Sequence, residues 1–152
     1  MILHSDRVYI GQHPRSKDEK NRITLPAKWR FPSEDSQLYI AVPNPSGCIT
    51  VYPPKMVEKL EEKVSLVSLG DKKGQKILTK LFSKADQLIC DSQGRVIIND
   101  MLSQHAELQR DVVLVGNFVT FSIWSPSRYE EYLNSDGDED DEFSRILTQL
   151  GL

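Results

Sequence analysis

Residues 18–26 read Asp-Glu-Lys-Asn-Arg-Ile-Thr-Leu-Pro, and their pattern returns at residues 91–99 as Asp-Ser-Gln-Gly-Arg-Val-Ile-Ile-Asn. The offset between the two copies is 73 residues. Each copy begins with an Asp that can open a turn, continues with a residue suited to positive φ (Asn21 or Gly94), and reaches an Arg that leads into an apolar run. This pattern is typical of a β-hairpin, and its return predicts two related structural units in one chain.

The similarity between the two halves continues beyond the turns. The β-branched run at 38–42 corresponds to the run at 112–116, and the alternating strand pattern at 49–54 corresponds to the one at 121–126. Units of about 50 residues bury too little apolar surface to be stable separately, so we expect the halves to share one hydrophobic core around a pseudo-twofold axis. The expected divisions are a first repeat at 8–56, a helical linker at 57–83, a second repeat at 84–128, and a C-terminal part at 129–152.

A short strand is expected at 7–11, where Val8 and Ile10 alternate with their neighbours at a period of two. A basic turn should follow over residues 13–21. Cys48 and Cys90 are both expected to be reduced thiols of the core, because free Cys is among the most buried residue types.

Apolar residues at helical spacing predict helices at about 54–68 and 71–84, and another at 127–133. The acidic segment at 134–142 has the composition of a disordered segment. After it, apolar residues at 143–150 return at helical spacing and predict a final amphipathic helix that docks on a partner or on the chain's own core.

Charge is distributed unevenly along the chain, although the net charge is only −3. Residues 7–30 carry seven basic and two acidic side chains, whereas residues 134–142 carry six acidic and no basic side chains. Such an asymmetry indicates a basic face and an acidic tail, and a basic face is a candidate surface for nucleic acid.

Nothing in the sequence indicates an enzyme. The two cysteines lack the paired spacing of a zinc site, and the three histidines are scattered. No nucleophile elbow or phosphate-binding loop is present, so we expect no catalytic residue, metal, cofactor or small-molecule substrate. No segment approaches the roughly 18 apolar residues of a membrane span, and the N-terminus lacks the apolar region of a signal peptide. We therefore expect a cytoplasmic protein with no membrane partner.

The doubled motif resembles the MraZ family of transcriptional regulators, in which two AbrB-like swapped-hairpin repeats each carry an Asp-x-x-x-Arg motif. That motif stands here at 18–22 and 91–95, and the similarity extends over about residues 8–133. Other similar stretches are Leu25-Pro26-Ala27-Lys28, Val51-Tyr52-Pro53, Val113-Leu114-Val115-Gly116 and Ile123-Trp124. The resemblance implies an α+β fold in which two pseudo-twofold-related repeats share one small β-barrel-like core with flanking helices.

The resemblance also implies a function. It implies a sequence-specific, nucleoid-associated DNA-binding protein that represses its own cluster of division and cell-wall genes. The partners would be operator repeats in double-stranded DNA and further copies of the chain in a ring-like oligomer. Asn21 stands where the family usually has Gly, and Asn tolerates the left-handed conformation that the turn requires.

Family resemblance places DNA contacts at Lys20 and Arg22, and the same basic stretch offers Arg15, Lys17 and Lys28 as supporting phosphate contacts. Strand alternation should turn Arg22 away from the core and leave it free for DNA, because Ile23 and Leu25 must face inward. The residues expected to shape the two turns are Asp18, Asn21, Asp91, Gly94 and Arg95.

Two alternatives stay open. Arg22 and Arg95 could simply pair with Asp18 and Asp91 across their turns, an arrangement that we favour for Arg95 because its surroundings lack a basic cluster. The whole chain could also be an oligomeric structural or partner-binding module of the same fold without strong DNA affinity, which its sequence pI of about 5.6 would suit.

Overall fold

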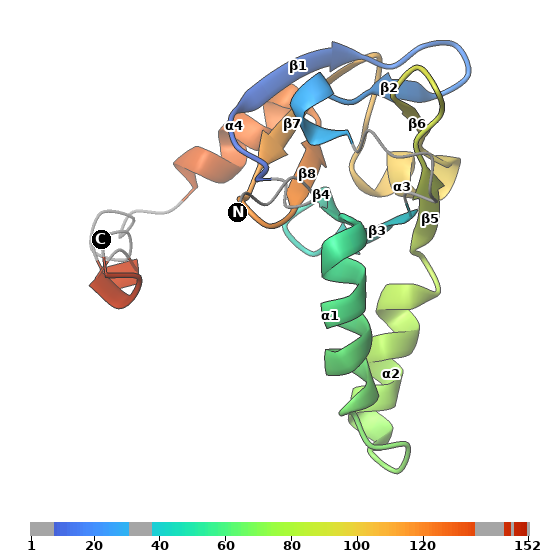
Figure 1. Cartoon of the computed structure of the whole chain (residues 1–152), viewed down its shortest axis with the longest axis vertical. Helices are drawn as coiled ribbons and strands as arrows, with labels where there is room; N and C mark the ends of the chain where they lie inside the picture. The colour runs from blue at the N-terminus through green and yellow to red at the C-terminus, as the bar shows by residue number, and fades with distance from the viewer. Residues whose placement is uncertain (1–7, 31–37, 136–144, 147, 152) are drawn as a thin grey trace, which may run out of the picture.

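A computed structural model describes residues 8–30, 38–135, 145–146 and 148–151 of the chain (Figure 1). The strands are β1 (Gln12–Ser16), β2 (Arg22–Thr24), β3 (Leu38–Asn44), β4 (Cys48–Tyr52), β5 (Asp86–Ile89), β6 (Arg95–Ile97), β7 (Asp111–Gly116) and β8 (Phe121–Trp124). The helices are the 3₁₀ turn η1 (Ala27–Trp29), α1 (Pro54–Ser65), α2 (Lys72–Phe82), α3 (Asp100–His105) and α4 (Pro126–Asn134). The predicted α+β class is confirmed.

Strands from the two halves of the chain pair with each other. The larger sheet has the order β1-β7-β8-β4-β3-β5, and β2 pairs with β6 in a separate two-stranded ribbon. All of these pairs are antiparallel. Exchanging each strand for its equivalent in the other half (β1 for β5, β3 for β7, β4 for β8) reverses the sheet order and leaves it otherwise unchanged. This is the pattern of a pseudo-twofold axis between β4 and β8.

One hydrophobic core takes residues from both halves. Ile23 and Leu25 of the first half and Val96 and Ile98 of the second are at most 1% exposed and belong to one cluster of buried residues. The ring of Trp29 packs against the ring of Phe121 from the other half, with 4.9 Å between ring centroids. The halves are therefore not separate globules.

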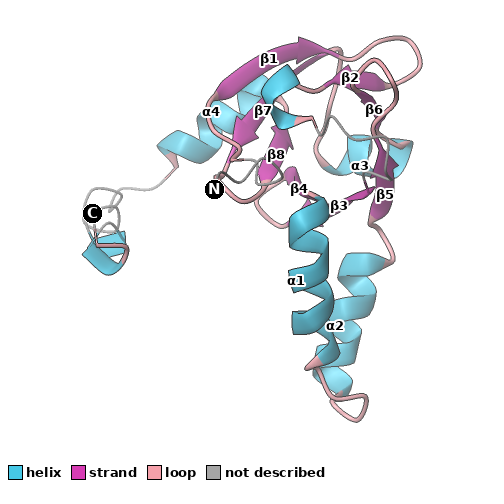
Figure 2. Cartoon of the chain, viewed as in Figure 1, coloured by secondary structure: helices cyan, strands magenta, loops and turns pink. Residues whose placement is uncertain are grey.

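The first two long helices project together from the strands (Figure 2). The helix α1 begins at Pro54, directly after Pro53, because a Pro in the first turn has no backbone N–H to leave unpaired. The side chain of Asp71 caps α2 by accepting a hydrogen bond from the Gly74 N–H at 2.9 Å. Both helices match the predicted ones and end two or three residues earlier. Neither contains a buried residue.

The prediction of an N-terminal strand at 7–11 is wrong in position. The strand begins at Gln12 and covers residues 13–16 of the expected basic turn, which is confined to the residues after Ser16. Tyr9 is 2% exposed, whereas Val8 and Ile10 are 46% and 60% exposed. The reason is aromatic packing: the Tyr9 ring lies against two other aromatic rings of the core, with centroid distances of 5.5 and 5.6 Å.

Parts of both ends of the chain are not described. Residues 1–6 and residues 136–142 of the acidic segment lie outside the described residues. Of the predicted final helix, Ile146 accepts a helical hydrogen bond from the Leu150 N–H at 3.0 Å, and both side chains are exposed. No helix among the described residues is both long and apolar enough to cross a membrane.

Candidate nucleic-acid interface

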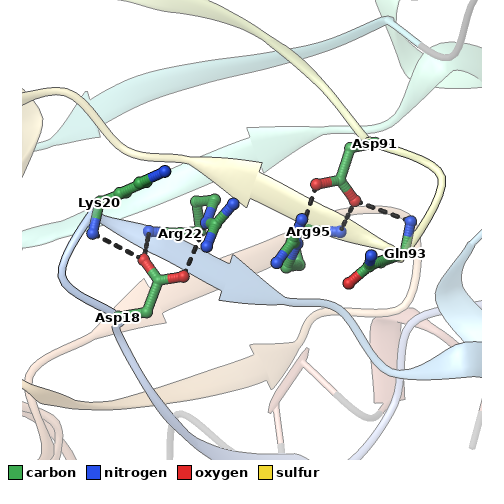
Figure 3. Close-up of polar contacts among 6 residues, drawn as sticks. All are labelled: Asp18, Lys20, Arg22, Asp91, Gln93 and Arg95. Atoms are coloured by element: carbon green, nitrogen blue, oxygen red, sulfur yellow. Dashed lines mark hydrogen bonds and ion pairs between the residues drawn. The ribbon is translucent and has the colours of Figure 1, made fainter.

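The first turn is held together by the carboxylate of Asp18. One carboxylate oxygen, Oδ1, accepts hydrogen bonds from the backbone N–H groups of Lys20 and Arg22, both at 2.9 Å. The other oxygen, Oδ2, accepts one from Nε of Arg22 at 2.7 Å (Figure 3). An Asp side chain that bonds the backbone two residues later fixes a turn locally, without help from the rest of the fold.

The second turn repeats this arrangement. Asp91 accepts from the N–H groups of Gln93 and Arg95 and from Nε of Arg95, each at 2.9 Å (Figure 3). The residue before each Arg has positive φ, 62° at Asn21 and 81° at Gly94. The prediction that both positions need left-handed backbone is therefore confirmed.

Both turn carboxylates are ionised at neutral pH. The pKa of Asp18 and the pKa of Asp91 are lowered from 3.8, first because the backbone N–H of the Arg four residues later donates to the carboxylate. The side-chain hydrogen bond and the positive charge of the same Arg lower each pKa further. The alternative that Arg22 pairs with Asp18 is thus confirmed: it forms the same ion pair as Arg95, and its side chain is 25% exposed.

The two turns also support each other. Within the β2–β6 ribbon, Ile23 pairs with Val96. At the ends of the ribbon, the Leu25 N–H donates to the Gly94 carbonyl at 2.8 Å, and the Ile98 N–H donates to the Asn21 carbonyl at 3.0 Å. Because the strand residues next to the two arginines are buried, strand alternation places both arginines on the outer face of the ribbon.

The structure brings only some of the predicted DNA contacts together. Lys17, Lys20 and Arg22 line an open groove of about 770 Å³ beside the first turn, with Ser16, Asp18, Glu19 and Arg110. Arg15 lies outside that lining and uses its guanidinium to tie β1 to β2, donating from Nε to the Thr24 carbonyl at 2.9 Å. Lys28 is exposed on η1 and does not line the groove.

Arg110 is a candidate that the sequence analysis missed. It belongs to the second half of the chain, directly before β7, and reaches the groove because β7 pairs with β1. Its carbonyl accepts a hydrogen bond from the Lys17 N–H at 2.7 Å. The available signal was a basic residue directly before an apolar strand, and only knowledge of the pairing between the halves would have placed it next to Lys17.

The described residues contain no cluster of His, Cys, Asp or Glu that could hold a metal ion. Cys48 and Cys90 are both free, Cys48 being buried and Cys90 half-buried. Burial raises the pKa of the Cys48 thiol to about 11 and also raises the pKa of Cys90. Neither thiol therefore has the lowered pKa of a reactive cysteine.

Residues 81–149 match the family model for the MraZ protein, which its description calls antitoxin-like. Three relatives, each named transcriptional regulator MraZ, align with 95% of this chain and with all of their own length. They come from Halothermothrix orenii (32% identical), Clostridium tetani (30%) and Pediococcus pentosaceus (32%). With relatives of this similarity over nearly its whole length, the chain belongs to the MraZ family of transcriptional regulators.

Proposed function

We propose that this protein binds double-stranded DNA in a sequence-specific manner and represses transcription of its own division and cell-wall gene cluster. The observation that carries the proposal is the cationic groove beside the first turn, where Lys17, Lys20 and Arg22 gather on a chain whose net charge is negative. A local basic surface attracts phosphates even when the whole molecule is acidic.

The Asp18–Arg22 pair suits base reading. The carboxylate holds only Nε of Arg22, and among the described residues the structure gives the two terminal nitrogens of this guanidinium no hydrogen bond. An Arg that is held through Nε can donate two hydrogen bonds from its terminal nitrogens to O6 and N7 of guanine in the major groove. Lys20 is exposed at the turn and acts as a phosphate contact.

The proposal includes the architecture around the turns. Each half is an AbrB-like swapped-hairpin repeat, as the pairing of β1 with β7 and of β5 with β3 supports. Copies of the chain assemble in a ring, so that several cationic grooves bind several operator repeats at once and modest affinities combine. A protein of this function works in the cytoplasm, on the nucleoid.

A binding titration tests the proposal. Fluorescence anisotropy with a labelled duplex from the region upstream of the protein's own operon is measured at rising salt concentration, beside a scrambled duplex. Tighter binding to the upstream duplex, with affinity that falls linearly on a log–log salt plot, is the expected result. An oligomer that binds neither duplex would overturn the proposal and would support the alternative of a structural or partner-binding module.

A further inference from the structure

We propose that Arg110 is a further DNA-contacting residue, whose guanidinium binds a backbone phosphate in the groove beside the first turn together with Lys17 and Lys20. The inference rests on the proposed function and deepens it. It adds a cation from the second half of the chain to a site that the sequence places entirely in the first half.

The pairing of β1 with β7 fixes the position of Arg110. Ser16 pairs with Asp111 at the end of this ladder, and one step further the Lys17 N–H donates to the Arg110 carbonyl at 2.7 Å. Successive side chains of an extended segment point to opposite sides. In agreement, Asp111 lines a neighbouring groove against α4, whereas Arg110 lines the groove of the first turn. The acid next to Arg110 therefore faces away from the phosphate site.

The guanidinium of Arg110 is available for a ligand. Arg15 and Arg30 each donate to a backbone carbonyl, and Arg22 donates to the Asp18 carboxylate. Arg110 is exposed, and the structure gives its guanidinium no hydrogen bond or ion pair with any described residue. An Arg whose five donors have no partner among the described residues fits the geometry of a phosphate, which it can bind through two parallel hydrogen bonds.

The charges of the groove favour an anion. Its lining contains four cations (Lys17, Lys20, Arg22 and Arg110) and two carboxylates (Asp18 and Glu19). The Asp18 carboxylate is neutralised by Arg22 within the turn. The remaining charges are three positive ones, on two lysines and Arg110, and one negative charge on Glu19, so the groove is positively charged. The groove volume of about 770 Å³ lies in the range of ordinary ligand sites and gives room for a phosphate with its sugar.

The test compares Arg110→Gln with a charge-matched control, Lys76→Gln on the exposed surface of α2. Affinity for the labelled upstream duplex is measured by anisotropy over a range of salt concentrations. Affinity falls as salt rises, so the slope of log affinity against log salt is negative. If Arg110 contacts a phosphate, Arg110→Gln makes this slope shallower by about 0.9, and by the same amount on a scrambled duplex. Arg110→Lys keeps the slope because it keeps the charge. Lys76→Gln leaves the slope unchanged, and all three variants melt at the temperature of the unmodified protein.

Two outcomes overturn the inference. The first is a slope for Arg110→Gln equal to that of the unmodified protein, and the second is an equal change for Lys76→Gln, which would reflect net charge rather than a contact. A lowered melting temperature for both Arg110 variants would assign this side chain a structural role and overturn it as well. Lys20→Gln separates the two proposals: if it makes the slope shallower while Arg110→Gln does not, the DNA-binding function stands and only the role of Arg110 fails.

Discussion

The two Asp–Arg turns have the same hydrogen bonds and different surroundings. In both, one Asp accepts two backbone N–H groups and the guanidinium Nε of the Arg four residues later. At the 73-residue offset, however, Lys17, Lys20, Lys28 and Arg30 of the first half correspond to Cys90, Gln93, Met101 and Ser103 of the second. The shared part builds the turn, and only the first turn has the basic residues around it that the proposed phosphate contacts require.

The same comparison extends to the outer faces of the two hairpins, each consisting of a turn with its flanking strands (β1 and β2, β5 and β6), which pair with strands of the other half and not with each other. Ser16 and Thr24 flank the first turn, and their equivalents at the second turn are Ile89 and Ile97, which are 68% and 57% exposed. Apolar side chains next to Arg95 offer no hydrogen bond to a phosphate. The comparison therefore supports the proposal that DNA binds at the first hairpin, and it favours a structural role for the second.

The largest effect is expected on stability, from core positions that the two halves share. Leu25→Ala and Ile98→Ala remove equivalent, fully buried side chains from the shared core. Each should lower the free energy of unfolding by about 2–5 kcal/mol, measured by urea denaturation. Gln93→Ala, at an exposed position, serves as the control and should change stability by less than about 0.5 kcal/mol. A large cost in one half and almost none in the other would show that the core is not shared.

The next effect should separate the two hairpins. Arg22→Ala is expected to cost about 1–3 kcal/mol of operator affinity and to relax the preference for a G-rich operator repeat, because it removes a bidentate base contact. Arg95→Ala should bind the operator as the unmodified protein does.

Stability provides the control for this pair of variants. Both lose an equivalent ion pair with Asp18 or Asp91, so both should lower the melting temperature by a similar amount. If Arg22→Ala binds as the unmodified protein and Arg95→Ala does not, the DNA-binding role belongs to the second hairpin instead.

A smaller effect is expected from the lysine that distinguishes the turns. Lys20→Ala should weaken binding to operator and scrambled DNA alike, because it removes one phosphate contact. For the same reason, the slope of log affinity against log salt should become shallower by about 0.9. Lys80→Ala on α2 also removes one positive charge, but Lys80 does not line the groove beside the first turn. This control should leave the slope unchanged. A loss confined to the operator sequence would instead mean that Lys20 reads a base.

The smallest expected effect concerns pH and is the same in both hairpins. Because folding lowers the pKa of Asp18 and of Asp91 below 3.8, their contribution to stability is complete above about pH 5. It is lost as the pH falls through 3.8 and then through the lower folded-state pKa. Asp18→Asn and Asp91→Asn should each make the melting temperature less sensitive to pH between 5 and 3. Unchanged acid sensitivity in both variants would contradict the ionised-carboxylate turns.

Local features of the fold were predictable from the sequence. Turn chemistry is written into neighbouring residues, so the Asp positions and the left-handed positions at Asn21 and Gly94 followed from the repeat. The buried pair Ile23 and Leu25 followed from strand alternation. These predictions depend on periods and residue types within a few positions of one another.

The repeat predicted a core shared by the two halves, but the pairs of residues that meet across it were not predictable. The neighbours Lys17 and Arg110 are 93 residues apart in the sequence and meet only through the β1–β7 ladder. Likewise, the burial of Tyr9 in place of Val8 depends on aromatic rings contributed by distant segments. The Asp18–Arg22 pair was foreseen only as an alternative, because strand alternation specifies a face and not a hydrogen-bond partner.

The pairing of β1 with β7 has a consequence for synthesis on the ribosome. Gln12 pairs with Val115, so the first strand has no partner until about 100 further residues have been made. At roughly 5–20 residues per second, that delay is about 5–20 s. During this delay, β1 cannot form its ladder with β7. Pairings between such distant segments are also intrinsically slow to form. The first hairpin is thus translated early and is completed only when β7 emerges.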